Sequence, residues 1–271
     1  MTKAAAVKRV LITGAAGNLG QKLRHRLERQ GGYELILLDR VNSPENSIFG
    51  VELSCVDESW NRHFEGVECV VHLAAEANPH ASWRSLLINN TAVASNVFAA
   101  AVARGVHRVV FASSLHTMFG YEGKASCITP DMPPQPPNLY GMSKVVSEEL
   151  AREYAQRRCI SIICLRLGTV YKDDRRPRLG IDSVARQHRW LSNGDFCQAC
   201  ERAIAVDEID FAVLHVTSRN AGSPWDLHAT ESMLGYRPQD GLIPQPPPWW
   251  RRMRNNLRRL RAPASEAWQY S

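Results

Sequence analysis

The chain lacks the long apolar runs of a membrane protein and the biased composition of a fibrous or disordered one. No unbroken apolar stretch reaches the roughly 18 to 20 residues that a membrane-spanning helix requires. The bases Lys3, Lys8 and Arg9 interrupt the N-terminal apolar run, which leads into a glycine loop, so we expect no signal peptide. With 271 residues, 44% of them hydrophobic and 22% charged, the chain can bury a sizeable core.

Paired cysteines are also missing from the pattern. The seven cysteines are an odd, scattered set, unlike those of an oxidised scaffold, and we expect a reducing, cytoplasmic compartment. Cys197 and Cys200 form a single CxxC within a helix-like stretch that has no second pair of ligands. Core packing therefore outweighs zinc or redox chemistry for this pair, and we expect no metal site.

A strong charge of one sign is absent from most of the chain. Lys and Arg number 33 against 27 Asp and Glu, a net charge of +6, but six of these bases lie between Arg251 and Arg261. Residues 1–250 hold 27 bases and 26 acids, so this part is almost neutral. We therefore expect neither nucleic acid nor a membrane surface as a general partner.

The basic C-terminal segment has its own pattern. Apolar residues recur there at helical spacing with arginines between them, which predicts an amphipathic helix after the proline-rich exit Pro244–Pro248. Its apolar stripe consists of Trp249, Trp250, Met253, Leu257 and Leu260. Such a stripe packs on its own domain or on a neighbouring subunit more often than on a membrane.

Short apolar runs alternate with longer amphipathic ones, which is typical of an α/β fold with a parallel sheet wrapped by helices. The expected strands are 10–13, 34–39, 67–73, 106–113, 160–165 and 212–216. The expected helices are 18–30, 89–104, 138–157, 196–206 and a last one from Ser223-Pro224 to Gly235. Pro130–Pro137 and Lys172–Arg178 are expected loops.

A glycine-rich loop, TGAAGNLG at 13–20, joins the first strand to the first helix. Glycines let the backbone turn sharply and approach a pyrophosphate, which the positive end of the helix stabilises. Asp39 ends the next strand, 19 residues after Gly20, where a carboxylate can bind ribose hydroxyls and would repel a 2′-phosphate. The pattern favours NAD over NADP, although the neighbouring Arg40 weakens that preference.

A phenol and an ammonium are four residues apart at Tyr140 and Lys144, and hence on one face of a helix. A free tyrosine titrates near ~10, and a nearby lysine charge favours its phenolate form. Ser113 and Ser114 close the fourth expected strand, at the carboxyl edge where open parallel sheets bind ligands.

Together these residues resemble the extended short-chain dehydrogenase/reductase family, also called the NAD-dependent epimerase/dehydratase family. The resemblance covers about residues 8–240 and rests on the glycine loop, Asp39, HLAA (72–75), FASS (111–114), YGMSK (140–144) and LRLGTVY (165–171). It implies a Rossmann-type doubly wound parallel sheet with a small C-terminal substrate-binding part. We expect a single domain over 1–243, with the cofactor part at about 1–167 and the substrate part at about 168–243, followed by the exit and helix at 244–271.

The resemblance also implies roles for single residues. The catalytic triad would be Ser114, Tyr140 and Lys144. The cofactor-binding residues would be Gly14, Ala16, Gly17, Asn18, Leu19, Gly20, Asp39, Leu73, Ala74, Ala75, Asn90, Tyr140 and Lys144.

Within that family the sequence looks most like the uronate dehydrogenases, which oxidise free hexuronic acids at C1 to aldarolactones with NAD. The stretches that carry this likeness are FASSLHTMFGY (111–121), PDMPPQPPNLYGMSK (130–144) and WDLHATESMLGYRPQD (225–240). The likeness implies a sugar acid as substrate and a homo-oligomer with contacts through the C-terminal helix.

Two departures bear on the substrate. The uronate dehydrogenases have a Ser-Asn-His run where this chain has Ser114-Leu115-His116, and they tend to have a serine at the position of Ala77. Both changes remove a group that could hydrogen-bond a sugar hydroxyl, at a cost of roughly 0.5–1.5 kcal/mol each. We expect Ala77, Ser114, Leu115 and His116 to contact the substrate.

The family uses an arginine for the uronate carboxylate, beyond the charged loop. Arg186 fits that region best and Arg189 competes with it. A guanidinium that pairs bidentately with a carboxylate is suitable chemistry for an acidic sugar. A solvated basic helix is the plain alternative for these two residues.

Other functions stay open at this point. A sugar-nucleotide epimerase or dehydratase would keep the fold and recycle its NAD, and Leu115 and Ala77 favour it. The short C-terminal part argues against it, because a nucleotide handle needs more chain to enclose it. A dehydrogenase for another sugar-like molecule is a further alternative, and a cofactor-binding scaffold whose basic tail binds nucleic acid or lipid is the least favoured.

Overall fold

The computed structural model describes residues 7–158 and 160–248, and within them seven parallel strands form one sheet in the order β3-β2-β1-β4-β5-β6-β7. The strands are β1 (Lys8–Thr13), β2 (Tyr33–Asp39), β3 (Ile48–Gly50), β4 (Cys69–His72), β5 (Arg108–Ser114), β6 (Ser161–Leu167) and β7 (Phe211–Val216). The chain order reverses between β1 and β4, and ligands bind at the carboxyl ends of the strands at such a point. This is the Rossmann-type, doubly wound sheet that the sequence predicted.

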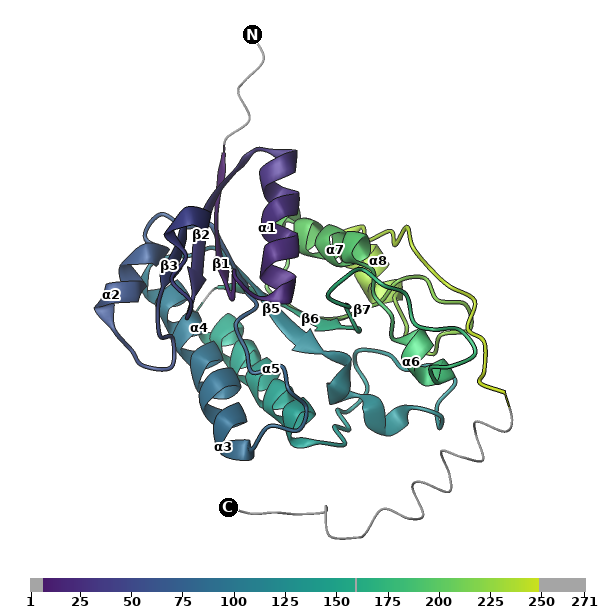
Figure 1. Ribbon diagram of the computed structural model, residues 1–271. Helices are drawn as coiled ribbons and strands as arrows, with labels where there is room; N and C mark the ends of the chain where they lie inside the picture. The colour runs from purple at the N-terminus through teal and green to yellow at the C-terminus, as the bar shows by residue number, and fades with distance from the viewer. Residues whose placement is uncertain (1–6, 159, 249–271) are drawn as a thin grey trace.

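Helices cover both faces of the sheet. They are α1 (Asn18–Gln30), α2 (Glu58–Asn61), α3 (Trp83–Leu86), α4 (Val93–Ala103), α5 (Leu139–Arg158), α6 (Val184–His188), α7 (Asn193–Ala205) and α8 (His228–Leu234). Short 3-10 turns are η1 (Pro44–Asn46), η2 (Arg62–Phe64), η4 (Leu115–Thr117) and η5 (Phe119–Tyr121), and η3 (Leu87–Ala92) is a π-helical segment. Figure 1 shows α1 and α7 side by side on one face and α4 and α5 on the other.

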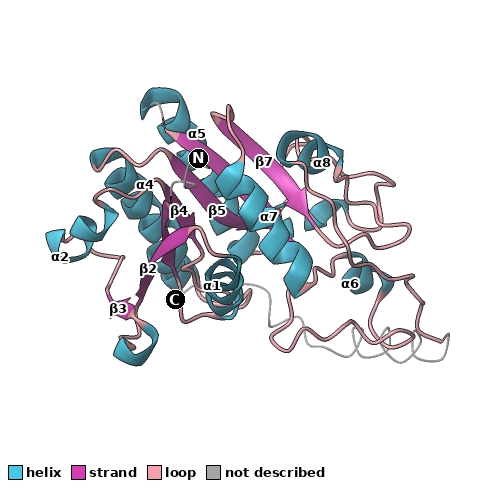
Figure 2. Ribbon diagram, turned by 90° about the horizontal axis from the view of Figure 1, so that it is seen from above, coloured by secondary structure: helices cyan, strands magenta, loops and turns pink. Residues whose placement is uncertain are grey.

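Each face of the sheet carries its own apolar core. The first core joins side chains of α1, α7 and α8 to β1, β5 and β6, and the second joins α4 and α5 to the opposite sides of the same strands. Seen from above, the strands lie between these two helix layers (Figure 2). Leu23 and Leu27, four residues apart on α1, are both fully buried, and each burial is worth roughly 1.5–3 kcal/mol.

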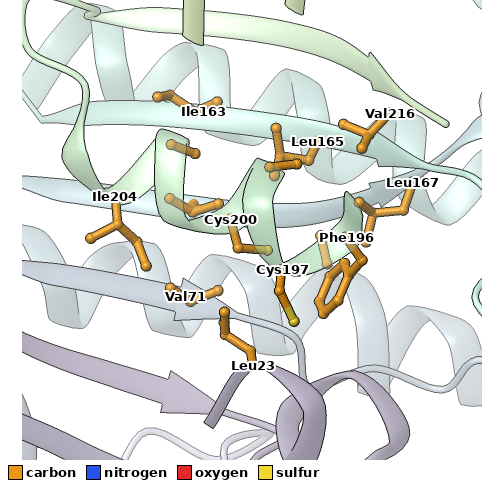
Figure 3. Close-up of a cluster of buried hydrophobic side chains, with 14 of the residues drawn as sticks. Leu23, Val71, Ile163, Leu165, Leu167, Phe196, Cys197, Cys200, Ile204 and Val216 are labelled. Atoms are coloured by element: carbon orange, nitrogen blue, oxygen red, sulfur yellow. The ribbon is translucent and has the colours of Figure 1, made fainter. Parts of the chain in front are cut away.

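The CxxC pair lies in the first core. Cys197 and Cys200 face the sheet from α7 among Leu23, Val71 and Ile163 (Figure 3). Burial raises the pKa of the Cys197 thiol to about 12 and raises that of Cys200 well above its ordinary value, so both stay protonated. In the described residues they act as small apolar side chains.

Every expected strand is present, and the differences lie at strand ends and in short elements. β3 was missed because it has only three residues, and it lies at an edge of the sheet. The helix expected at 89–104 begins earlier, at Trp83, because the Ser82 hydroxyl accepts the Ser85 N–H and caps it there.

The helix start expected at Ser223-Pro224 is wrong. Trp225 instead forms a parallel bridge with Ile128, whose N–H donates to the Pro224 carbonyl at 2.7 Å. These contacts hold the segment extended, and α8 begins at His228, whose N–H donates to the Asp226 carboxylate. Gly235 ends the helix in the left-handed conformation as expected, with φ of 66°.

The run Trp83–Ala103 has the length and mean hydropathy, 1.5, to cross a membrane, although polar residues interrupt it. Half of its most apolar window is buried. Val97, Phe98 and Ala101 of this run are fully buried in the second core. These contacts make the run a core helix of the fold.

The proline-rich exit is tied to the body of the protein. The Gln187 side chain donates to the Gln245 carbonyl at 2.7 Å and accepts the Gln245 N–H at 2.8 Å. The amphipathic helix expected from Trp249 onward lies outside the described residues, so the oligomer expected from it stays a prediction.

Candidate active site

The glycine loop between β1 and α1 packs closely against neighbouring backbone and lines a cleft. Gly14 has φ of +70°, and a Cβ there would lie 2.7 Å from the Ala74 nitrogen. A Cβ on Gly20 would lie 2.2 Å from the Gly14 carbonyl oxygen, so this glycine packs the helix against the loop. Gly17 is the N-cap of α1 and no side chain caps the helix, which leaves its first N–H groups available to an anion. The loop therefore fits the pyrophosphate of a dinucleotide.

Asp39 braces this loop from the end of β2. One carboxylate oxygen accepts the Ala16 N–H at 3.0 Å and the other accepts the Val41 N–H at 3.1 Å. The carboxylate is partly exposed, and each oxygen has a second lone pair for a ribose hydroxyl. Asp39 is thus both a structural brace and a candidate ribose ligand.

Ser114, Tyr140 and Lys144 meet at the carboxyl ends of the central strands. β5 ends at Ser114, and the Asn138 side chain accepts the Gly141 N–H, which fixes the first turn of α5 with Tyr140. Ser114 and Tyr140 line the same cleft, and the Ser114 hydroxyl accepts the His116 N–H at 3.2 Å. The structure therefore brings into one cleft the three residues for which the resemblance implied a catalytic role.

Burial dominates the protonation of the triad. It raises the pKa of the Tyr140 phenol above its ordinary value, and the hydrogen bond from Ser114 opposes that rise. Burial lowers the pKa of Lys144 to about 8, and the Glu148 carboxylate opposes that fall. The Lys144 nitrogen donates to the Ala112 carbonyl at 2.9 Å and lies 5.9 Å from the centre of the Tyr140 ring. The expected lowering of the phenol pKa by Lys144 is not the leading effect in this structure.

A buried ion pair lies below Lys144. Glu148, one turn further along α5, accepts two hydrogen bonds from Arg166 of β6, at 2.9 Å and 2.7 Å. Both side chains are almost fully buried, and Ser113 also donates to Glu148. The pair joins α5 to the ends of β5 and β6, which holds the triad on a rigid base.

A cleft of about 360 Å³ connects the glycine loop to the triad. Its lining from the loop side comprises Gly14, Gly17, Asn18, Leu19, Gly20, Leu73, Ala75 and Ala77. Its lining from the sheet and beyond comprises Ala112, Ser113, Ser114, His116, Phe119, Tyr140, Lys144, Leu167, Gly168, Thr169, Val170 and Arg189. One cleft therefore joins the glycine loop to Ser114, Tyr140 and Lys144.

Residues 10–189 match the NAD dependent epimerase/dehydratase family. The chain belongs to this family. The cofactor expected from the glycine loop and Asp39 is thereby confirmed as NAD, and the cradle at Gly14, Gly17 and Gly20 fits it.

Similar proteins in this family include sugar dehydrogenases. The chain is 34% identical to the L-arabinose 1-dehydrogenase (NAD(P)(+)) of Haloferax volcanii, over 86% of this chain and 96% of that protein. It is 30% identical to the uronate dehydrogenase of Pseudomonas putida, over 86% of this chain and 84% of that protein. A mutant uronate dehydrogenase from Agrobacterium tumefaciens, solved with NAD, superposes with a TM-score of 0.74 at 26% identity, covering 96% of this chain and 92% of that one.

The family fold brings most of the predicted site residues into the cleft, and four others, Ala16, Asp39, Ala74 and Asn90, lie outside its lining and support it. The Ala16 N–H donates to Asp39, and the Ala74 N–H donates to the Thr13 hydroxyl at 3.3 Å. Asn90 is buried, donates to the Ser143 hydroxyl at 3.0 Å and accepts the Glu76 N–H at 2.8 Å. It therefore ties α5 to the loop after β4.

Leu115 does not line the cleft, contrary to its expected contact with the substrate. It is 1% exposed and packs in a small third core with Met118, Ile128 and Trp225. The 3-10 turn that follows β5 points this side chain inward while His116, the next residue, faces the cleft. Ala77 does line the cleft.

Arg186 lies outside the cleft, and its competitor Arg189 lines it. Arg186 is exposed and pairs with Asp182, one turn back, at 3.3 Å. Arg189 follows the last turn of α6, lies 4.3 Å from the Phe119 ring centre and pairs with Glu122 at 3.1 Å. The three-residue offset along this short helix carries the two side chains to different surroundings.

Sequence reasoning missed Phe119 and the loop after β6 as parts of the site. Gly168, Thr169 and Val170 belong to the LRLGTVY stretch, which follows a strand and so was a usable signal for the cleft edge. The Asn18 side chain donates to the Val170 carbonyl at 3.2 Å and thus ties this loop to the start of α1. Phe119 carried no local signal, because only the packing of η5 turns it toward the cleft.

Proposed function

We propose that this protein oxidises the C1 hydroxyl of a free sugar in its ring form to a lactone, with NAD as the hydride acceptor. The observation that carries the proposal is the placement of Ser114, Tyr140 and Lys144 in the same cleft as the glycine loop. The names of the L-arabinose 1-dehydrogenase and the uronate dehydrogenases support a sugar as the substrate. A hexuronic acid is the candidate that the sequence favoured.

Each residue of the triad has a distinct role in this reaction. Tyr140 removes the proton of the C1 hydroxyl as the C1–H bond gives up its hydride. Ser114 hydrogen-bonds the same oxygen and stabilises the developing charge. Lys144, with a pKa of about 8, carries a charge at neutral pH that stabilises the phenolate while the proton passes toward solvent. NAD supplies the hydride acceptor when it is bound.

Replacing Tyr140 tests this mechanism. Tyr140→Phe removes the base and should lower kcat for NADH formation from a free sugar by about 10²- to 10⁴-fold, because no other group holds its position. NADH absorbance at 340 nm over a panel of free aldoses and uronic acids is the measurement. Tyr121→Phe is the matched control, since the Tyr121 hydroxyl only donates to the Pro133 carbonyl. Full activity of Tyr140→Phe would refute the assigned role.

The rival reaction, epimerisation or dehydration of a sugar nucleotide, loses one of its supports. Leu115 favoured it as a substrate contact, but this side chain is buried away from the cleft. The rival predicts that NAD is recycled, so a sugar nucleotide would be converted with no net NADH. The proposed function predicts one NADH per sugar oxidised, and the two are separated by this stoichiometry.

A further inference from the structure

We infer that the substrate is an uncharged sugar and that Glu122 is the residue that determines this specificity, because it pairs with Arg189, an arginine that lines the cleft. The inference rests on the proposed function and concerns the sugar end of the same cleft. Arg189 then acts as a neutralised hydrogen-bond donor to sugar hydroxyls.

The position of Arg189 is fixed on several sides. Its Nε donates to the Ala185 carbonyl at 3.1 Å and lies 3.1 Å from a Glu122 carboxylate oxygen. Its guanidinium lies over the Phe119 ring, and Phe119 lies 4.1 Å from the His116 ring, centre to centre. A side chain held in this way does not swing out to find another carboxylate.

Glu122 is an internal part of this arrangement. The side chains of Glu122 and Arg189 are each 18% exposed, so their charges interact with little screening by water. Burial raises the pKa of the Glu122 carboxyl, and the Arg189 charge opposes that rise. Burial lowers the pKa of Arg189, and Glu122 opposes that fall. Each charge therefore opposes the shift that burial causes in the pKa of the other, and the ion pair as a whole has no net charge.

The other cleft residues supply no spare cation for a sugar carboxylate. Among the described residues that line the cleft, Lys144 is the other cation, and this buried residue donates from its nitrogen to the Ala112 carbonyl. Burial and the Arg189 charge lower the pKa of His116 to about 4, so this imidazole is neutral at pH 7. Arg186 is held by Asp182 outside the cleft.

A uronate would therefore bring a second carboxylate to the Arg189 guanidinium, which is already paired with the Glu122 carboxylate. Two carboxylates sharing one buried guanidinium repel each other, and neither is fully paired. A neutral sugar brings no second carboxylate, and its hydroxyl oxygens can accept hydrogen bonds from the Arg189 N–H groups. The charge balance of this end of the cleft favours aldoses over the corresponding uronic acids.

Matched sugar pairs test the inference directly in the full-length protein. D-galactose and D-galacturonate, and likewise D-glucose and D-glucuronate, differ only in whether C6 is an alcohol or a carboxylate. With saturating NAD, kcat/KM should be at least about tenfold higher for the neutral sugar than for the uronate, in whichever pair is turned over faster. A tenfold factor corresponds to the interaction energy that shifts a pKa by about one unit. L-arabinose, which has no C6, serves as a third neutral substrate.

Variants of Glu122 locate the effect. Glu122→Gln keeps the shape and frees the Arg189 charge, so the ratio of kcat/KM for uronate to that for aldose should rise about tenfold. Glu122→Asp keeps the charge and should leave the wild-type preference in place. Asp182→Asn is the matched control, because it releases Arg186 from a similar ion pair outside the cleft and should not change the ratio.

The outcomes distinguish a failure of the inference about Glu122 from a failure of the proposed function. A wild-type preference for the uronate in both pairs would overturn the inference alone, and so would an unchanged ratio in a folded Glu122→Gln variant. If Glu122→Gln does not fold, the wild-type ratio decides. No NADH from any sugar of either class would overturn the proposed function, and the inference with it.

Discussion

Side-chain direction at single positions decides which residues of this protein can touch a substrate. Leu115 and His116 are neighbours in the chain, yet one is buried in an apolar core and the other faces the cleft. Arg186 and Arg189 are on the same short helix segment, yet only the second reaches the cleft. Sequence position alone therefore assigns a site residue poorly where the backbone turns within one or two residues.

Leu115 gives a prediction at this scale. Leu115→Asn restores the residue typical of the uronate dehydrogenases, but it places an amide among Met118, Ile128 and Trp225. We expect it to lower the free energy of unfolding by about 3 to 5 kcal/mol, from the lost apolar contacts and an unpaired amide. Urea denaturation is the measurement, with the exposed Leu179→Asn as the control. A stable variant with a lower KM for a uronate would contradict the buried position of Leu115.

At the scale of elements, two glycines between β1 and α1 serve different purposes, one for packing and one for ligand binding. Gly20 packs the helix on the loop, since its Cβ would overlap the Gly14 carbonyl oxygen. Gly17, in contrast, has extended backbone at the helix start, and a Cβ there would lie 3.1 Å from the same oxygen. Gly20 is therefore required for packing, and Gly17 keeps the start of the helix accessible to a ligand.

Alanine at each glycine tests this division. Gly20→Ala should cost at least about 2 kcal/mol in the free energy of unfolding, because backbone atoms must shift to relieve the overlap. Gly17→Ala should stay folded, with a change below about 1 kcal/mol, and should weaken NAD binding at least about tenfold, because the methyl group occupies the approach to the helix start. Thermal unfolding and calorimetric titration with NAD are the measurements. Equal effects of both variants on stability would refute the separation.

At the scale of the whole molecule, the sheet buries two neutral imidazoles, one on its central strand and one on an edge strand. Burial lowers the pKa of His72 on β4 and of His215 on β7 to about 3 from an ordinary value of 6.5, and the charges of Lys144 and Arg166 add to this. Below pH 6.5 these side chains bind protons in the unfolded chain but not in the folded one. The folded state therefore loses stability as the pH falls from about 6.5 toward 3.

These two buried histidines predict that the protein becomes less stable in acid. Each of these histidines should reduce the free energy of unfolding by about 2 kcal/mol between pH 7.5 and pH 5. His215→Phe removes one such proton and should make this loss smaller, whereas the exposed His107→Gln should leave it unchanged. Urea denaturation at the two pH values is the measurement. The same loss in His215→Phe and in the wild type would contradict the contribution of His215.

Local patterns in the sequence predicted most of the fold. Apolar runs predicted six of the seven strands, and α1 was placed with both ends correct, because Gly17 and Gly31 delimit it locally. The start of α8 was misplaced because a contact with Ile128, remote in the chain, holds residues 224–226 extended. Serine and proline predict a helix start only when no strand-like partner competes.

The sequence by itself determined the parallel sheet and the NAD loop, because each depends on periodicity or spacing within one element or at its end, and the family resemblance singled out Ser114, Tyr140 and Lys144. The sugar end of the cleft was decided by the tertiary structure. Phe119 and Glu122 lie together at η5, but Arg189 follows α6, far along the chain, and no local pattern records that they meet. Whether an arginine can pair with a carboxylate of the substrate depends on whether the fold has already placed a carboxylate of the protein beside it.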